Sequence, residues 1–454
     1  MLLDCRMLLF SCVIIVIAGL DARNATLESQ MRDALQTQLT LSAQKWRTGF
    51  QLAIVLNDAR VEMAAGMADP VAGRAVTVRD TFLLGSATKP VTASAVLQLV
   101  DRGLFALDDY VAPMVDGFLL RANGTTLAGL LGAPAQHITV RHLAGMQSGL
   151  ADYDSYDLRE FTYSHPGATF SPIDALHAVA GLGSNATFIC DPGTCSQYSS
   201  TNFIVLGLLL ASFDPVANST ADWSRYDQRG VIRNARCAAA ADFAHFSFAK
   251  AGACSHSVTT HGFTAIGTPQ GRSMDVSALD CLNGWTCGNI ATTSLDMANF
   301  MFDLLGPAAR IVSNNSRTEM QKWHPFTVGW CSGMLYGLGL GPLPTTNETD
   351  TFITALVGHG GDTYGYASAT GYNPQFNFSV TLASNNETLG TNLLNPHVSD
   401  ALCQAFKVLL PVLYATGRYA HLPHINVTCQ HIDPQMADLA VRRKRIARDD
   451  SGEE

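Results

Sequence analysis

The chain has 454 residues, of which 47% are hydrophobic and 15% charged, so it can bury a sizeable core in one large domain or a two-lobed unit. Its net charge of −9 excludes a general nucleic-acid role, because phosphate binding needs clustered Lys and Arg. The one dense basic cluster, residues 442–445, lies in a charged tail over 441–454 that we predict to be solvated and disordered; a dibasic protease site is the alternative.

The N-terminus has the pattern of a signal peptide. Arg6 precedes the apolar run from Met7 to Leu20, which is short for a membrane span, and small residues lie between 18 and 22. We predict that residues 1–22 are removed and that no stable membrane span remains. An uncleaved N-terminal anchor is the alternative.

Asn-X-Ser/Thr sequons are frequent, which indicates a glycosylated protein of a eukaryotic secretory pathway. We therefore expect the protein to be secreted or to reside in the lumen of that pathway. The sequons begin at Asn24, Asn123, Asn185, Asn218, Asn314, Asn347, Asn377, Asn386 and Asn426.

Cysteine spacing points to the same oxidising compartment. No C-x-x-C pair or H-E-x-x-H motif is present, which disfavours a zinc site as the competing interpretation. Spacing leaves several connectivities open. Our predicted pairs are Cys190–Cys195, Cys281–Cys287, Cys237–Cys254 and Cys403–Cys429, with Cys331 left over.

The first predicted elements are a helix and a hairpin. Residues 28–47 have the pattern of a polar amphipathic helix. The β-type runs 50–56 and 61–64 flank the turn residues Asn57-Asp58, which predicts a β-hairpin. A third short apolar run, 81–84, leads to Gly85-Ser86.

A helix is predicted next, from Ser86 to Arg102, because apolar residues recur at helical spacing; Gly103 ends it. The middle, about 105–300, has helical stretches broken by Gly, Pro and Asn, and 212–280 is irregular and has the character of an insertion. β-type runs follow near 333–340, 351–357, 364–370 and 376–384, with a turn at Asn373-Pro374 and a closing helix over 395–415.

This order predicts an α/β (α+β) fold. One antiparallel sheet would be assembled from both chain ends, about 48–104 and 325–415, and flanked by helices. A mostly helical lobe, about 105–300, would be inserted between them.

Three Ser-x-x-Lys motifs occur, and this spacing on a helix puts both side chains on one face. They begin at Ser42, Ser86 and Ser247. Only Ser86 follows an apolar strand and a glycine at the start of a long amphipathic helix, where free N–H groups favour a developing oxyanion. A desolvated Lys89 can take the proton of Ser86. An ordinary helix N-cap serine is the alternative.

Residues 82–100 resemble the Ser-x-x-Lys segment of the serine β-lactamase and penicillin-binding protein superfamily, most closely its branch of class C β-lactamases, D-alanyl-D-alanine carboxypeptidases and esterases. The segments 138–150, 291–300 and 336–339 are similar to later stretches of that family, in the same order. We therefore expect a β-lactamase-like domain over 23–440, in which only 212–280 has no recognised counterpart.

The resemblance implies a second motif, Tyr-x-Asn, at Tyr198. This tyrosine would have a lowered pKa beside the lysine ammonium and would shuttle protons. The sequence departs from the family at Ser200, where asparagine is usual, and Asn202 lies two residues too far on to replace it. The loss of an amide that donates to the substrate carbonyl puts the grip on a peptide or β-lactam in question.

The third motif of the family has the form His-x-Gly in the carboxypeptidase and esterase branch, and His359 matches it. The resemblance implies that His359 lies on an edge strand facing the cleft and polarises the substrate or tunes Tyr198. Gly360 and Gly361 would let substrate approach the backbone. The Asp362 N–H would join the Ser86 N–H as the oxyanion hole.

Together these residues predict a secreted serine hydrolase that cleaves an ester, amide or lactam bond through an acyl-enzyme on Ser86, with no metal or organic cofactor and no separate deacylating carboxylate. The substrate would be a small molecule or a peptide or ester, with an ester or small amide favoured over a β-lactam. The sequence leaves the oligomeric state open. The alternative is a catalytically weak or inactive relative that serves as a binding or scaffold protein.

Overall fold

The computed structural model describes residues 27–183, 186–233, 243–249, 252–266, 268, 272–281, 284–329, 331–343, 356–387 and 395–429. The predicted signal peptide and charged tail lie outside these residues, as do Asn24, Asn185, Asn347 and Cys237.

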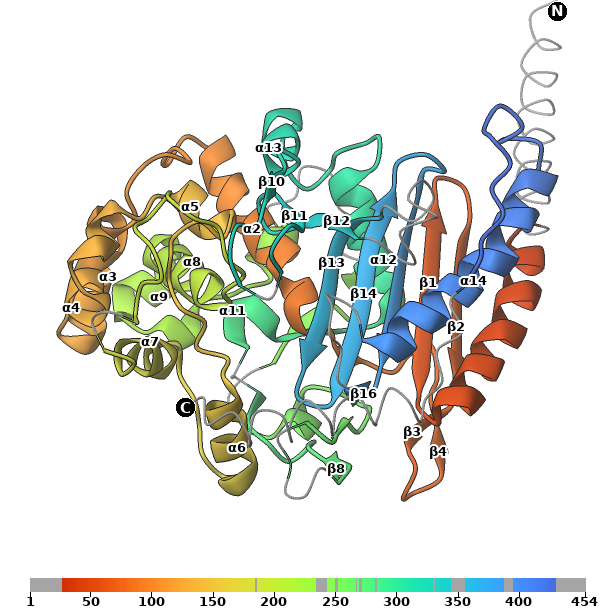
Figure 1. The fold of residues 1–454 in the computed structure, drawn as a ribbon, viewed down its shortest axis with the longest axis horizontal. Coiled ribbons are helices and arrows are strands. Elements are labelled where there is room, and N and C mark those ends of the chain that lie inside the picture. Colours follow the sequence, from red (N-terminus) through yellow and green to blue (C-terminus); the bar gives the residue numbers. More distant parts are fainter. Residues whose placement is uncertain are drawn as a thin grey trace, which may run out of the picture.

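One antiparallel sheet is built from both ends of the chain, as predicted (Figure 1). The hairpin expected near residues 50–64 is confirmed as the last two strands of this sheet. The strand after residue 377 pairs with the first strand of the chain along its whole length. The order is β12 (Gly341–Leu343), β13 (Leu356–Thr363), β14 (Tyr366–Asn373), β15 (Phe378–Ser384), β1 (Phe50–Leu56) and β2 (Arg60–Ala65).

Both faces of this sheet are covered by helices, which explains why every residue of β1 is buried. Leu52 and Ile54 lie in an apolar cluster with the helix over 27–46 and α14 (Pro396–Ala415). Val55, on the opposite face, packs with α12 (Ser294–Leu305). Side chains alternate along a strand, so the two faces receive separate sets.

The closing helix, α14, is long and apolar enough by length and composition to cross a membrane. In this structure it packs on the sheet, and most of its apolar side chains belong to the sheet's core cluster. Its apolar character is therefore accounted for by burial within the fold.

The helical lobe lies beside the sheet and is centred on α8 (Thr201–Phe213), whose apolar residues occupy every side of the helix (Figure 1). A Cβ at Gly207 would lie 2.1 Å from the Thr286 hydroxyl, so this glycine lets α8 approach α11 (Trp285–Gly288) closely. The other helices are α2 (Thr88–Asp101), α3 (Ala112–Asn123), α4 (Leu127–Leu131), α5 (Val140–Ala144), α6 (Tyr156–Ser164), α7 (Pro172–Ala180), α9 (Pro215–Thr220), α10 (Gly230–Arg233) and α13 (Asn314–Met320).

The described part of segment 212–280 contributes short strands that pair with the rest of the fold. β6 (Ser247–Phe248) pairs with β9 (Ile290–Thr292), which also pairs with β5 (Phe82–Leu83) just before Ser86. β7 (Phe263–Thr264) pairs with β8 (Met274–Asp275) and, in parallel, with β16 (Asn386–Glu387). Strand pairing thus joins the described part of this segment to β9 and to β16, both of which lie outside it.

The predicted boundaries of two β-type runs were wrong. In the run near 333–340 only Leu335–Tyr336 forms a strand, β11, which pairs with β10 (His324–Pro325). A turn follows, in which the Gly337 N–H donates to the Leu340 carbonyl. The predicted end of the run near 351–357 was too early, because the strand, β13, continues to Thr363; residues 351–355 lie outside the described residues, so the predicted start stays a prediction.

Among the described residues three disulfides are formed, and two match the prediction: Cys190–Cys195 and Cys403–Cys429. The third joins Cys254 to Cys281, so the predicted pairs Cys281–Cys287 and Cys237–Cys254 were wrong. The Cys254 N–H donates to the Leu279 carbonyl, which holds the two segments at a Cα–Cα distance of 4.7 Å. Disulfides of this kind are compatible with an extracellular protein.

Cys287 and Cys331 are free and buried. We predict that iodoacetamide alkylates neither thiol in the native protein and both after unfolding in guanidinium, because buried thiols are inaccessible. Peptide mapping under non-reducing conditions should also yield a fragment that links Cys254 to Cys281. A fragment that links Cys281 to Cys287 would contradict this structure.

Candidate active site

Ser86 lies at the junction of sheet and helical lobe, in the single turn η1 (Gly85–Ala87) that leads into α2. Gly85 has a φ of 54°, and a Cβ there would lie 2.7 Å from the Asp362 nitrogen of β13. Only glycine tolerates both conditions. The glycine before the serine therefore seats the turn directly against the sheet.

The Ser86 hydroxyl contacts two of the residues expected from sequence. Lys89 Nζ and the Tyr198 hydroxyl each lie 2.8 Å from Ser86 Oγ. Lys89 follows one helical turn later, whereas Tyr198 comes from the segment that precedes α8. The tertiary structure thus brings the first and second motifs together around one oxygen.

Lys89 is fully buried, and all three of its hydrogen-bond partners are neutral. Besides Ser86 Oγ, they are Ser200 Oγ at 3.3 Å and the Cys287 carbonyl at 3.2 Å. Burial penalises the ammonium form and lowers the pKa of Lys89. Ser200, in place of the usual asparagine, therefore still contacts the lysine.

The expected lowering of the Tyr198 pKa was wrong. Burial raises the pKa of Tyr198 well above its ordinary value. Burial lowers the pKa of Lys89 as well, so the ammonium that was expected to stabilise a phenolate is itself disfavoured. Tyr198 therefore keeps its proton and donates it in the hydrogen bond to Ser86 Oγ.

His359 was expected on an edge strand, but β13 lies inside the sheet because β12 pairs with it; among the described residues this pairing ends at Gly358, one residue before His359. The imidazole, however, is 2% exposed and contacts Tyr336 rather than open space. Nδ1 faces the Gly360 carbonyl, which can only accept, so Nδ1 carries the proton and Nε2 accepts from the Tyr336 hydroxyl at 3.1 Å.

Desolvation, followed by the nearby Lys89, lowers the pKa of His359 to about 3, so the imidazole is neutral. Its ring centroid lies 6.0 Å from that of Tyr198, and Tyr336 packs against both rings. In this arrangement His359 supports the tyrosine through packing.

Of the two glycines after His359, Gly361 differs from expectation, whereas the role expected for Gly360 stays a prediction. A Cβ at Gly361 would lie 1.8 Å from the Leu84 carbonyl, which also accepts from Ser368 Oγ at 2.8 Å. The close approach at Gly361 is therefore made by the chain itself and not by substrate. Gly360 pairs with Ala369 of β14.

Asp362 presents its backbone nitrogen beside Gly85, the residue that precedes Ser86. This is the neighbourhood in which the resemblance expected an oxyanion hole. The Asp362 side chain, by contrast, is exposed.

Asp152 is a residue that the sequence reasoning missed. Its Oδ1 accepts from the Ser200 N–H at 3.0 Å and from the Asp154 N–H at 3.2 Å. Asp152 is half-buried. Desolvation, followed by the charge of Asp154, raises the pKa of Asp152 to about 7. The only signal in the sequence was its place directly after the family-like segment 138–150.

The other two Ser-x-x-Lys motifs have structural roles. Lys45 forms an ion pair with Asp400 at 2.7 Å, and Ser42 is buried in the same helix. Ser247 donates to the Ala291 carbonyl at 2.7 Å, while Lys250 lies outside the described residues.

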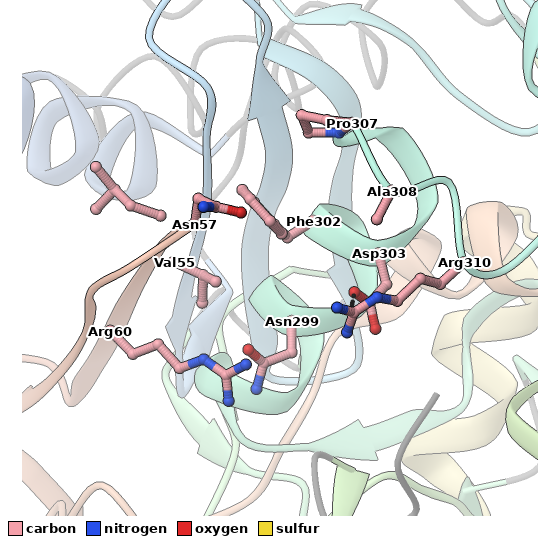
Figure 2. A pocket seen from close by; sticks show the side chains of 10 residues that line it. Val55, Asn57, Arg60, Asn299, Phe302, Asp303, Pro307, Ala308 and Arg310 are labelled. Carbon is pink, nitrogen blue, oxygen red and sulfur yellow. Dashed lines mark ion pairs between the residues drawn. The ribbon is translucent and has the colours of Figure 1, made fainter. Parts of the chain in front are cut away.

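A cavity of about 290 Å³ lies elsewhere, between the β1–β2 turn and the end of α12 (Figure 2). Arg310 pairs there with Asp303 at 3.5 Å, and Arg60 points toward Asn299. This cavity is separate from the candidate active site, because it is not lined by any of the four predicted catalytic residues, Ser86, Lys89, Tyr198 and His359.

An antiparallel sheet beside a helical lobe, with a serine and lysine at their junction, defines a β-lactamase-like class of fold. A family model described as Beta-lactamase matches residues 26–398. The chain therefore belongs to the β-lactamase family.

Two curated relatives match parts of the chain. Penicillin-binding protein 4 of Amycolatopsis lactamdurans is 30% identical over 162 residues, which are 36% of this chain and 37% of that protein. Esterase EstB of Burkholderia gladioli is 35% identical over 114 residues, which are 22% of this chain and 27% of that protein. The chain thus matches little more than a third of the length of the first relative and about a quarter of the length of the second.

Solved structures share the fold at low identity. D-amino acid amidase from Ochrobactrum anthropi SV3 has a TM-score of 0.63 at 18% identity, covering 85% of this chain and 99% of that chain. A penicillin-binding protein homologue from Pyrococcus abyssi, described as octameric, has a TM-score of 0.57 at 18% identity, covering 91% and 80%.

We predict that Gly361→Ala lowers the free energy of unfolding by about 1–3 kcal/mol, because the added methyl overpacks the contact between β13 and Leu84. Urea midpoints measure the change. Gly167→Ala is the matched control, since a Cβ at Gly167 meets no atom within 4 Å and should change stability by less than about 0.5 kcal/mol. Equal midpoints for the two variants would contradict the close approach.

Proposed function

We propose that this protein is a secreted serine hydrolase that cleaves an ester, amide or lactam bond through an acyl-enzyme on Ser86. The observation that carries the proposal is the position of Ser86 Oγ, 2.8 Å from both a buried lysine and a buried tyrosine. A hydroxyl becomes nucleophilic when a neutral base lies within hydrogen-bond reach, and the lowered pKa of Lys89 supplies that base.

In the proposed acylation, Ser86 Oγ attacks the substrate carbonyl while its proton moves to Lys89 Nζ. The negative charge develops on the carbonyl oxygen, which the Ser86 and Asp362 N–H groups would stabilise. Tyr198 then donates its proton to the leaving group, and the proton on Lys89 passes to the resulting phenolate, which restores the phenol and the neutral amine. A water molecule, activated by the same lysine, releases the acyl group and regenerates Ser86.

Among substrates we favour an ester or a small amide. The matched relatives include an esterase, and the structural neighbours include D-amino acid amidases. Ser200 contacts Lys89 but offers a short hydroxyl where the family carries an amide, which supports a weaker grip on the carbonyl of a peptide or β-lactam.

Secretion and glycosylation are part of the proposal. The three disulfides support an oxidising compartment. Of the described sequon asparagines, Asn123, Asn314 and Asn426 are exposed, and Asn218, Asn377 and Asn386 are half-buried. The exposed three are the most accessible sites for glycan transfer.

A second candidate is a binding or scaffold protein without activity, favoured by the loss of asparagine at Ser200. A panel of esters, D-amino acid amides, D-peptides and β-lactams separates the two. Turnover that Lys89→Met abolishes would rule the scaffold function out.

We predict that a fluorophosphonate probe labels the wild type, that Ser86→Ala abolishes labelling, and that Lys89→Met slows it by about 10²–10⁴-fold, the usual contribution of a general base. Ser42→Ala, the serine of a motif outside the site, should label at the wild-type rate. Labelling that persists in Ser86→Ala, or is lost equally in Ser42→Ala, contradicts the assignment.

The lowered pKa of Lys89 sets the direction of the pH dependence. The amine is the active form, so the labelling rate should rise with pH through the lysine pKa and level off well below the pH at which exposed lysines lose their protons. The measurement is the second-order labelling rate from pH 4 to 10. A rate that rises only at the pH typical of an exposed lysine would show that Lys89 is not desolvated as described.

A further inference from the structure

Residues 151–153 and 199–201 are held together by hydrogen bonds on both sides of Asp152. The Ala151 carbonyl accepts from Ser199 Oγ at 3.1 Å and from Thr201 Oγ1 at 2.7 Å. The Tyr153 N–H donates to Thr201 Oγ1 at 3.1 Å. The carboxylate of Asp152 completes this ladder.

The Asp152 contact fixes the residue that touches the lysine. Oδ1 accepts from the Ser200 N–H at 3.0 Å, and Ser200 Oγ lies 3.3 Å from Lys89 Nζ. Ser200 is the first residue before α8, where backbone N–H groups have no partner within the helix. Without the carboxylate this N–H would lose its acceptor, and the hydroxyl would be less firmly held.

The charge of Asp152 also affects the pKa of Lys89. The carboxylate favours the ammonium form of the lysine, in opposition to burial. Asp154, whose N–H donates to Asp152 Oδ1, pairs with Arg159 at 3.2 Å. The titratable groups around Asp152 are Asp154 on its own loop, Lys89 on α2, Tyr198 before α8, Cys287 on α11 and Cys331 after β10.

We propose that Asp152 is a positioning residue for the serine–lysine pair: one carboxylate oxygen holds the Ser200 backbone against Lys89, and the charge of the carboxyl decides how readily Lys89 exists as the neutral amine. The inference rests on the proposed function for its consequence in catalysis, but its structural part, the coupling between Asp152 and Lys89, does not depend on activity.

Because burial raises the pKa of Asp152 to about 7, the carboxyl is neutral in acid and ionised in mild alkali. Its ionisation returns part of the Lys89 population to the ammonium form, so it opposes the loss of the lysine proton. The pH at which Ser86 becomes nucleophilic is therefore set by both residues.

Two substitutions separate the effect of the hydrogen bond between Asp152 and the Ser200 N–H from the effect of the Asp152 charge. Asp152→Asn keeps an oxygen acceptor for the Ser200 N–H but cannot ionise, whereas Asp152→Ala removes both. With a fluorophosphonate probe, Asp152→Asn should label within about threefold of wild type at the optimum, with the rise of the rate shifted by about one unit to lower pH. Asp152→Ala should lose at least about tenfold, because the Ser200 donor is left unpaired. A profile for Asp152→Asn that superimposes on wild type, or equal rates for both variants, would overturn the proposal.

A double-mutant cycle tests the same pair without any activity. Urea unfolding of wild type, Asp152→Asn, Lys89→Met and the double variant should reveal a coupling at pH 8, where Asp152 is ionised, that disappears at pH 5, where it is protonated. Absence of coupling at pH 8 would overturn the inference even if the wild type is labelled. Coupling in a wild type that no probe labels would sustain the pair and instead refute the proposed hydrolase function.

Discussion

The candidate active site depends on one physical constraint, which is that the amine of Lys89 is buried away from water. Transfer of an ammonium ion from water into a protein interior costs several kcal/mol unless an opposite charge compensates it. The three direct partners of Lys89 are two hydroxyls and a carbonyl, none of them charged. Burial therefore disfavours the ammonium form of Lys89, and it also raises the pKa of Tyr198, which favours the phenol.

The position of that amine depends on contacts between distant parts of the chain. The turn that carries Ser86 packs against β13. At Gly85 and Gly361 the two segments approach so closely that no side chain larger than a hydrogen atom fits. β13 belongs to the same sheet as β1, so the C-terminal half supplies one wall of the candidate site, whereas Ser86 comes from the N-terminal half. A mispositioned sheet would expose Lys89 to water and remove the desolvation that lowers its pKa.

Ser200 departs from the family pattern, which has asparagine at this position, but the contact with Lys89 is retained. The hydroxyl of Ser200 is shorter than an asparagine amide but still contacts Lys89. It does so from a backbone position that a neighbouring carboxylate fixes. Burial raises the pKa of this carboxyl to about 7, so a group that titrates near neutrality lies directly beside Ser200.

Sequence alone determined the local features: the hairpin from periodicity two, α2 and α14 from helical spacing, and the Ser86–Lys89 pair from one helical turn. These depend on interactions within a few residues, which sequence spacing encodes. The convergence of Tyr198 on Ser86 was reached only through family resemblance. Tertiary structure decided the pairing of Cys254 with Cys281, the contact of His359 with Tyr336, the proton on Tyr198 and the approach of Asp152. Each depends on burial or on segments tens of residues apart, and neither is encoded in local spacing.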